Sequence, residues 1–120
     1  MKSVLTLAVL ALMLVGTSAF AQNASKGDFK VDGNTEGYSL GSGSGARTQP
    51  VFVKFDKKFA AAPVVIVTLT GFSGNAGSDG KMNISVSAEN ITTEGFVAKV
   101  GTWGDTKLAA VYGSWLAVKK

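Results

Sequence analysis

Alternating apolar and polar residues are clearest between positions 83 and 103, where two short runs flank a polar turn. Residues two apart share one face of a β-strand, so the run at 84–88 has three apolar side chains on one face. The run at 96–102 alternates in the same way and is followed by Trp103. Gly95, in the joining turn, can take a positive φ. The pattern predicts a β-hairpin with one apolar face and one polar face.

The rest of the chain carries further strand signals, separated by short clusters of Gly, Asp and Asn. Residues 64–69 are apolar except for Thr68, which is typical of a strand covered on both faces, and residues 71–80 indicate a loop. Six strands without a helix predict an all-β fold, a six-stranded antiparallel β-sandwich. The expected strands are residues 28–32, 51–55, 64–69 and 108–118, with the two arms of the hairpin at 82–103. The expected core consists of Phe29, Val31, Phe55, Phe59, Ile66, Ile84, Val86, Phe96, Val100, Val111 and Trp115.

Glycine and serine dominate residues 33–50, including the run Gly-Ser-Gly-Ser-Gly at 41–45. A glycine-rich loop of this kind can bind phosphate when a helix opens directly after it. Here Pro50 and a strand follow instead, so a phosphate-binding loop is rejected. The segment is predicted to be a flexible surface loop.

The first 21 residues have the features of a secretory signal peptide. Lys2 precedes an apolar stretch at 4–15, and the small-x-small site at 19–21 ends at Ala21. The stretch is 12 residues long, which is too short to span a membrane. Cleavage after Ala21 predicts a mature domain of residues 22–120 that is secreted or periplasmic, without a membrane span. The shortness of the signal is typical of bacteria.

Composition excludes several function classes. The chain has 12 basic and 8 acidic residues; without Lys2 the mature part has 11 − 8, a net charge of +3. These charges are scattered, so no nucleic-acid-binding stripe is expected. No cysteine is present, so no disulfide can form, and small exported domains of this kind gain stability by oligomerising.

Catalytic chemistry also lacks its usual residues. The chain has no His and no Cys, so neither a His-based triad nor a thiol nucleophile can be built. Its eight acids are isolated along the sequence and show no calcium-loop spacing. We therefore expect no enzyme activity, no metal and no cofactor. Two carboxylates brought together in space, as in glycosidases, are the alternative that the sequence leaves open.

Trp103 is the best candidate for binding. Neutral sugars are held by an aromatic ring against their apolar face and by fixed polar groups at their hydroxyls. Trp103 ends the polar face of the hairpin beside a Gly-Asp-Thr turn, which suits the first role. A half-buried Trp that closes the sandwich is the alternative. Trp115 lies among apolar residues and is predicted to be in the core.

Four stretches of this sequence together resemble the H-type lectin domain of snail agglutinins and of the C-terminal part of discoidins. They are VKFDKKFAAAPVVIVTLTGF, AENITTEGF, TWGDTKL and SWLA, and the resemblance covers residues 29–118. It implies a six-stranded antiparallel sandwich that forms trimers, in some members stacked into hexamers. It also implies non-catalytic binding of galactose or N-acetylgalactosamine in clefts between protomers, a function suited to cell adhesion.

The resemblance also assigns site positions. The family's Trp falls on Trp103, and its Arg falls on Asn83. Gly104 stands where the snail protein has His, and Ala109 where an aromatic residue is expected. Ser44 stands where a loop of the neighbouring chain supplies an Asp. We therefore predict carbohydrate binding, with an exported oligomeric structural or protein-interaction module that has lost the sugar as the alternative.

Overall fold

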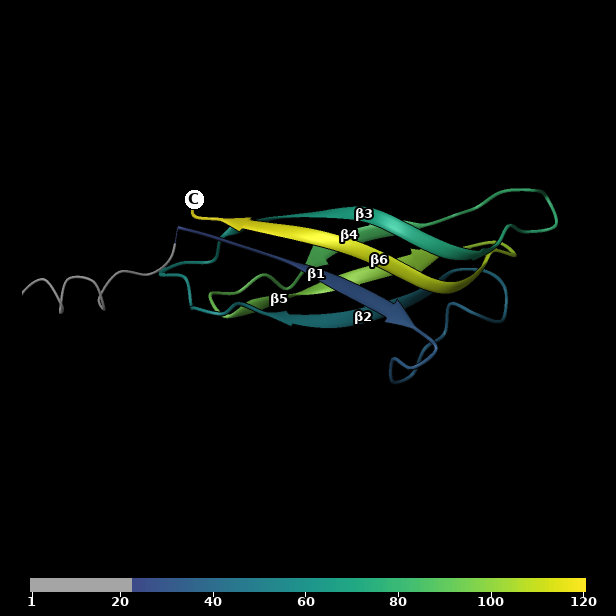
Figure 1. Cartoon of the computed structure of the whole chain (residues 1–120), viewed down its shortest axis with the longest axis horizontal. Coiled ribbons are helices and arrows are strands. Elements are labelled where there is room, and N and C mark those ends of the chain that lie inside the picture. The colour runs from purple at the N-terminus through teal and green to yellow at the C-terminus, as the bar shows by residue number, and fades with distance from the viewer. Residues whose placement is uncertain (1–22) are drawn as a thin grey trace, which may run out of the picture.

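The computed structural model describes residues 23–120 and folds them into two three-stranded sheets that stack as two layers (Figure 1). One sheet has the order β1-β6-β3, the other β2-β5-β4, and all neighbouring strands are antiparallel. The strands are β1 (Ala24–Asp32), β2 (Arg47–Lys54), β3 (Val64–Asn75), β4 (Ser85–Glu89), β5 (Gly95–Thr102) and β6 (Lys107–Val118). The predicted six-stranded antiparallel sandwich is thus confirmed.

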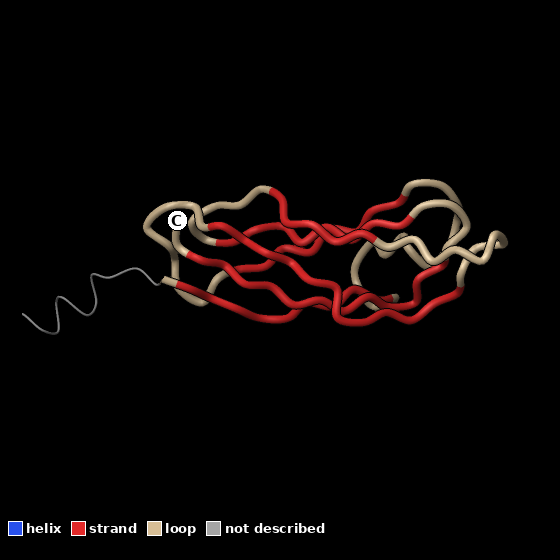
Figure 2. The backbone as a smooth tube through the Cα atoms, turned by 90° about the horizontal axis from the view of Figure 1, so that it is seen from above, coloured by secondary structure: helices blue, strands red, loops and turns tan. Residues whose placement is uncertain are grey.

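Strands and loops alone make up the described part of the chain (Figure 2), so it holds no helix able to cross a membrane. The signal peptide predicted at 1–21 lies outside the described residues. The start of the predicted domain falls there as well.

Several strands are longer than the sequence pattern indicated. β2 begins at Arg47 and runs through Pro50, whose missing N–H is tolerated because β2 is an edge strand. β3 continues to Asn75, so the loop expected at 71–80 is wrong in its first half. The pairing of β3 with β6 shifts register at Gly71 and at Gly74, as is common where glycine interrupts a strand. These irregularities hid the second half of β3 from a reading based on alternation.

The predicted hairpin is confirmed, with β4 paired to β5. Phe96, Ala98 and Val100 are fully buried on the face that the alternation assigned to the core. Gly95 has a different role from the expected one. The turn has its positive φ at Asn90 (51°), whereas Gly95 is required because a Cβ there would lie 2.3 Å from the carbonyl oxygen of Val53.

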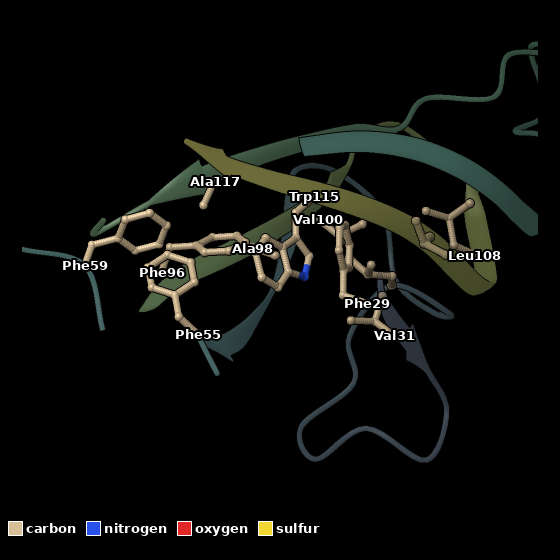
Figure 3. Packing of buried hydrophobic residues seen from close by; sticks show 12 residues of the cluster. Phe29, Val31, Phe55, Phe59, Phe96, Ala98, Val100, Leu108, Trp115 and Ala117 are labelled. Atoms are coloured by element: carbon tan, nitrogen blue, oxygen red, sulfur yellow. The ribbon is translucent and has the colours of Figure 1, made fainter. Parts of the chain in front are cut away.

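An aromatic cluster forms one part of the core (Figure 3). The ring of Phe55 lies edge-on to that of Phe59, with centroids 5.0 Å apart, and 5.7 Å from that of Trp115. Trp115 is 8% exposed, which confirms its predicted core position. Ile84 and Val86 are partly buried against the core. The other buried residues of the predicted core are Phe29, Val31, Phe96, Val100 and Val111.

The prediction that Ile66 lies in the core is wrong. Ile66 is 54% exposed, because it lies opposite Leu116 on the outer surface of the β1-β6-β3 sheet. Val64 and Tyr112 are also exposed, and their register places them on the same surface. We call these four residues the outer apolar face. The expectation that residues 64–69 are covered on both sides is therefore wrong for the chain as described.

The connection between β1 and β2 is anchored, which corrects the expected flexible loop. Leu40 is fully buried, and its carbonyl accepts a hydrogen bond from the Leu108 N–H at 2.8 Å. The Tyr38 hydroxyl donates to the Leu108 carbonyl at 2.5 Å. Burial raises the pKa of Tyr38 above its usual value, so this donor stays protonated at neutral pH. Leu40 and Leu108 are core residues that the strand pattern did not reveal.

Candidate functional site

The turn between β5 and β6 carries Trp103 at one end of the sandwich. β5 and β6 are the central strands of the two sheets, so this turn crosses from one layer to the other. Gly104 has a φ of +67°, which allows the chain to reverse directly after the tryptophan. Trp103 is 47% exposed. The connections from β1 to β2 and from β3 to β4 lie at the same end (Figure 1).

Asn83 is fixed against this turn. Its Nδ2 donates to the Trp103 carbonyl at 3.1 Å, and its backbone N–H donates to Oγ1 of Thr106 at 3.1 Å. The Thr102 hydroxyl donates to the Asn83 carbonyl at 2.7 Å. Both threonines are buried, so their hydrogen bonds hold Asn83 from inside the fold. The amide of Asn83 therefore holds the backbone of Trp103 and keeps one N–H and its Oδ1 for a ligand.

Ser44 lies in a second loop that is bonded to Gly104. The N–H of Gly45 donates to the Gly104 carbonyl at 2.9 Å, and the ammonium group of Lys107 donates to the carbonyl of Gly43. Ser44, between these two anchored glycines, is exposed. The four predicted site residues thus lie at one corner of a single chain. A contribution from a neighbouring chain stays a prediction.

Four residues at this corner escaped the sequence reasoning. Arg47 donates to the Gly104 carbonyl at 3.0 Å, and Ser78 donates to Oδ2 of Asp105 at 3.0 Å. Lys107 is the fourth. Asp105 could have been found from its place next to Trp103 and Gly104. Arg47 carried no such signal, because its partners are backbone carbonyls of residues far away in the sequence.

The corner combines one aromatic surface with uncharged polar groups, while its charged side chains are bonded within the chain: Arg47 and Lys107 to backbone carbonyls, and Asp105 to Ser78. Trp103 provides the aromatic face, while the Asn83 amide, the Ser44 hydroxyl and backbone groups provide donors and acceptors. Residues 23–120 contain no group of three potential ligands that could hold a metal ion. Ala109, predicted at an aromatic position, is exposed and adds no further ring. Such a set suits a neutral, polyhydroxylated ligand better than an ion.

A hollow of about 560 Å³ lies elsewhere, on the outside of the β1-β6-β3 sheet. Lys26, Ile66, Thr68 and Leu116 are among its lining residues. It shares two residues with the outer apolar face and none with the corner at Trp103. Asp28 and Ser114 also line the hollow, but its one aromatic residue, Trp115, is only 8% exposed, so we take the corner at Trp103 as the candidate ligand site.

The two antiparallel three-stranded sheets make this chain an all-β sandwich domain. The model of one family, the H-type lectin domain, matches residues 50–118. The chain therefore belongs to the H-type lectin family. Together with the six antiparallel strands, this match confirms the resemblance found in the sequence.

Individual relatives agree with this assignment. A protein of Fuscovulum blasticum described as ATP synthase subunits region ORF 7 is 36% identical over 83 residues, which cover 69% of this chain and 70% of that protein. Discoidin-2 of Dictyostelium discoideum is 33% identical over 81 residues, 68% of this chain and 31% of that protein. The chain thus spans about a third of discoidin-2, so the activity of that whole protein is not carried over.

Solved structures lead to the same fold. Recombinant discoidin II of Dictyostelium discoideum superposes with a TM-score of 0.72 at 29% identity, covering 80% of this chain and 36% of that one. The tailspike gp61 of Pseudomonas phage phi297 gives a TM-score of 0.53 at 14% identity over 81% of this chain and 15% of that one. The second likeness shows the fold alone.

Proposed function

We propose that this domain binds a neutral sugar of galactose or N-acetylgalactosamine type at Trp103 and carries out no reaction on it. The observation that carries the proposal is the exposed indole of Trp103, on a turn tied to both sheets. The ring stacks on the apolar face of the sugar, while Asn83 of the same chain and Ser44 of a neighbouring chain bond to its hydroxyls. Gly104 has no side chain and so leaves room for the Asn83 amide, since a Cβ there would lie 3.2 Å from Asn83 Nδ2. Membership of the H-type lectin family supports the same function.

Binding is expected to be weak at each site, with a Kd on the order of 0.1–1 mM, or about 4–5 kcal/mol. A glycan array followed by calorimetry with N-acetylgalactosamine tests this. EDTA should leave the affinity unchanged, because no metal-binding group occurs within residues 23–120. Salt should have little effect, because the ligand is uncharged. A wild-type protein that binds no glycan would refute the proposal.

We further propose that the domain forms a homotrimer, or a hexamer of two trimers. The mature chain has 120 − 21 = 99 residues and no cysteine, so it has little stability to spare as a monomer. Val64, Ile66, Tyr112 and Leu116 expose the outer apolar face to solvent, and a second copy packed there would cover it. In such an assembly a neighbour adds a second wall to each sugar cleft. Several weak sites on one oligomer provide the avidity needed for adhesion to glycan-bearing surfaces.

Ile66→Glu should dissociate this oligomer. The substitution places a carboxylate on the outer apolar face, and burying an unpaired charge is strongly unfavourable. The monomer should still fold, because Ile66 is exposed within the chain. Light scattering coupled to gel filtration measures the result. Ser87→Glu, which adds the same charge to the exposed surface of β4, should leave the oligomer intact. Wild-type protein that is monomeric at micromolar concentration would contradict the assembly.

We also propose that the domain is exported and that the mature chain begins at Gln22. The support is the sequence of residues 1–21, with its apolar stretch and its cleavage site at Ala21. The intact mass of material collected outside the cytoplasm should correspond to residues 22–120. Retention of the first 21 residues in that material would reject the cleavage.

A second candidate function is an exported module that assembles or recognises a protein without binding sugar. It is favoured by Asn83, whose amide already holds the Trp103 carbonyl, and by the small side chains at Gly104, Ser44 and Ala109. Losing a charged donor and an aromatic face removes about 1–3 kcal/mol each from a lectin site. An oligomer that ignores every glycan on the array would select this candidate.

A further inference from the structure

Arg47 is the chain's only arginine, and its side chain reaches the corner that carries Trp103. Its Nε–H donates to the Gly45 carbonyl at 2.9 Å, and its Nη1 donates to the Ser42 carbonyl at 2.7 Å. Its Nη2 donates to the carbonyls of Gly104 at 3.0 Å and Thr106 at 2.9 Å. These bonds use four of the five N–H donors of a guanidinium group. Every acceptor is a backbone carbonyl.

The bonds join two segments that are far apart in the sequence. Loop 42–45 lies on one side of the guanidinium group and turn 103–106 on the other. All residues of loop 42–45 are exposed and none is larger than serine, so no apolar packing fixes the loop. Its other links are one backbone hydrogen bond to the turn and the ammonium group of Lys107. Within residues 23–120, Arg47 therefore supplies two of the four hydrogen bonds that hold loop 42–45.

Only an arginine can make this set of contacts. The guanidinium group is planar and spreads its donors over three nitrogens, so it bonds to carbonyls on both sides at once. A lysine has one nitrogen at the end of a flexible stem and cannot span both segments. Because no carboxylate within residues 23–120 accepts from Arg47, these bonds serve to fix backbone rather than to neutralise a charge.

We propose that Arg47 is the positioning residue of the sugar site. It holds loop 42–45 against turn 103–106 and so fixes the place from which Ser44 reaches a sugar in the cleft with a neighbouring chain, and it makes no contact with the sugar itself. This inference rests on the proposed function for its ligand, but the ordering of loop 42–45 can be measured without one. A loop that is ordered before the ligand arrives loses less conformational entropy on binding, which strengthens a weak site.

The test compares Arg47→Lys and Arg47→Gln with wild type. Amide exchange followed by NMR reports the loop, because the Gly45 N–H is bonded to the Gly104 carbonyl. Calorimetry with N-acetylgalactosamine reports affinity, and thermal unfolding reports the fold. Lys54→Ala is the matched control, since Lys54 is an exposed cation at the other end of β2.

We expect both Arg47 variants to exchange the Gly45 amide faster while the amides of β5 and β6 keep their protection. Affinity should fall about tenfold with little change in Tm, and Lys54→Ala should match wild type. Wild-type protection at Gly45 in both variants would overturn the inference, even if affinity falls, because Arg47 would then act by contact. Unfolding of both variants would also overturn it. If wild type binds no sugar, the proposed function fails, and exchange at Gly45 alone decides whether Arg47 holds the loop.

Discussion

Replacing Trp115 with alanine will destabilise the domain by about 3–5 kcal/mol, the usual cost of removing a buried tryptophan. Its indole lies between the sheets, with ring centroids 5.5 Å from Phe96 and 5.7 Å from Phe55. On the adjacent strand, Gly27 leaves room for the ring, since a Cβ there would lie 2.8 Å from it. Alanine leaves a cavity that the paired strands cannot close. Urea unfolding, compared at equal protein concentration, measures the loss.

Two further variants decide whether the loss comes from packing. Trp115→Phe keeps a ring in the cluster and should cost clearly less than Trp115→Ala. Ser114→Ala changes the neighbouring residue, which lies on the other face of β6, and should stay within about 0.5 kcal/mol of wild type. An alanine variant as stable as wild type would show that the aromatic cluster is not the centre of the core.

The hydrophobic pattern predicted the layers of the fold well where one face of a strand is solvated. In β5, alternation alone separated buried Phe96, Ala98 and Val100 from their neighbours. It was wrong for Ile66, because Thr68 is the one polar residue in the run at 64–69 and was too weak a signal to mark the outer face that the two share. A sequence shows the same apolar run whether the face that it forms is covered by the same chain or by a second copy.

Loop residues were harder to predict than strand residues. Leu40 stands between polar and glycine residues, yet it is fully buried and its carbonyl bonds to Leu108. Hydrophobic periodicity does not predict such a contact between segments that are nearly seventy positions apart in the sequence. The same holds for Arg47, which bonds to Gly104 and Thr106 across 57 and 59 positions. Backbone acceptors look alike in every residue, so a sequence cannot reveal which of them a side chain will reach.

Residues of the candidate site could be predicted only where the sequence aligns with the site positions of the family that it resembles. Trp103 and Asn83 were found together, and the structure places them in contact. The bond itself could not be foreseen, because Asn83 was expected to serve a ligand, whereas its Nδ2 holds the Trp103 carbonyl. At the position where the resemblance expects an Arg, Asn83 thus supports the turn.

Replacing Trp103 with alanine will abolish measurable sugar binding while leaving the domain folded. The indole is 47% exposed, and the turn is tied through the Trp103 carbonyl, which alanine retains. The neighbouring bond from Gly45 to Gly104 also involves only backbone atoms. Loss of the stacking surface should weaken binding by roughly 2 kcal/mol, about thirtyfold. From a starting Kd on the order of 0.1–1 mM, this moves the affinity beyond the range of calorimetry.

Phe52 supplies a matched control for this variant. Its ring is 67% exposed on β2, away from the turn, so Phe52→Ala removes a comparable aromatic surface without touching the site. Sugar affinity should then equal that of wild type, whereas Trp103→Phe should retain part of it by keeping a ring in place. Circular dichroism and Tm should be unchanged in Trp103→Ala. An alanine variant that unfolds would make Trp103 a structural residue, and one that binds normally would move the sugar site away from this corner.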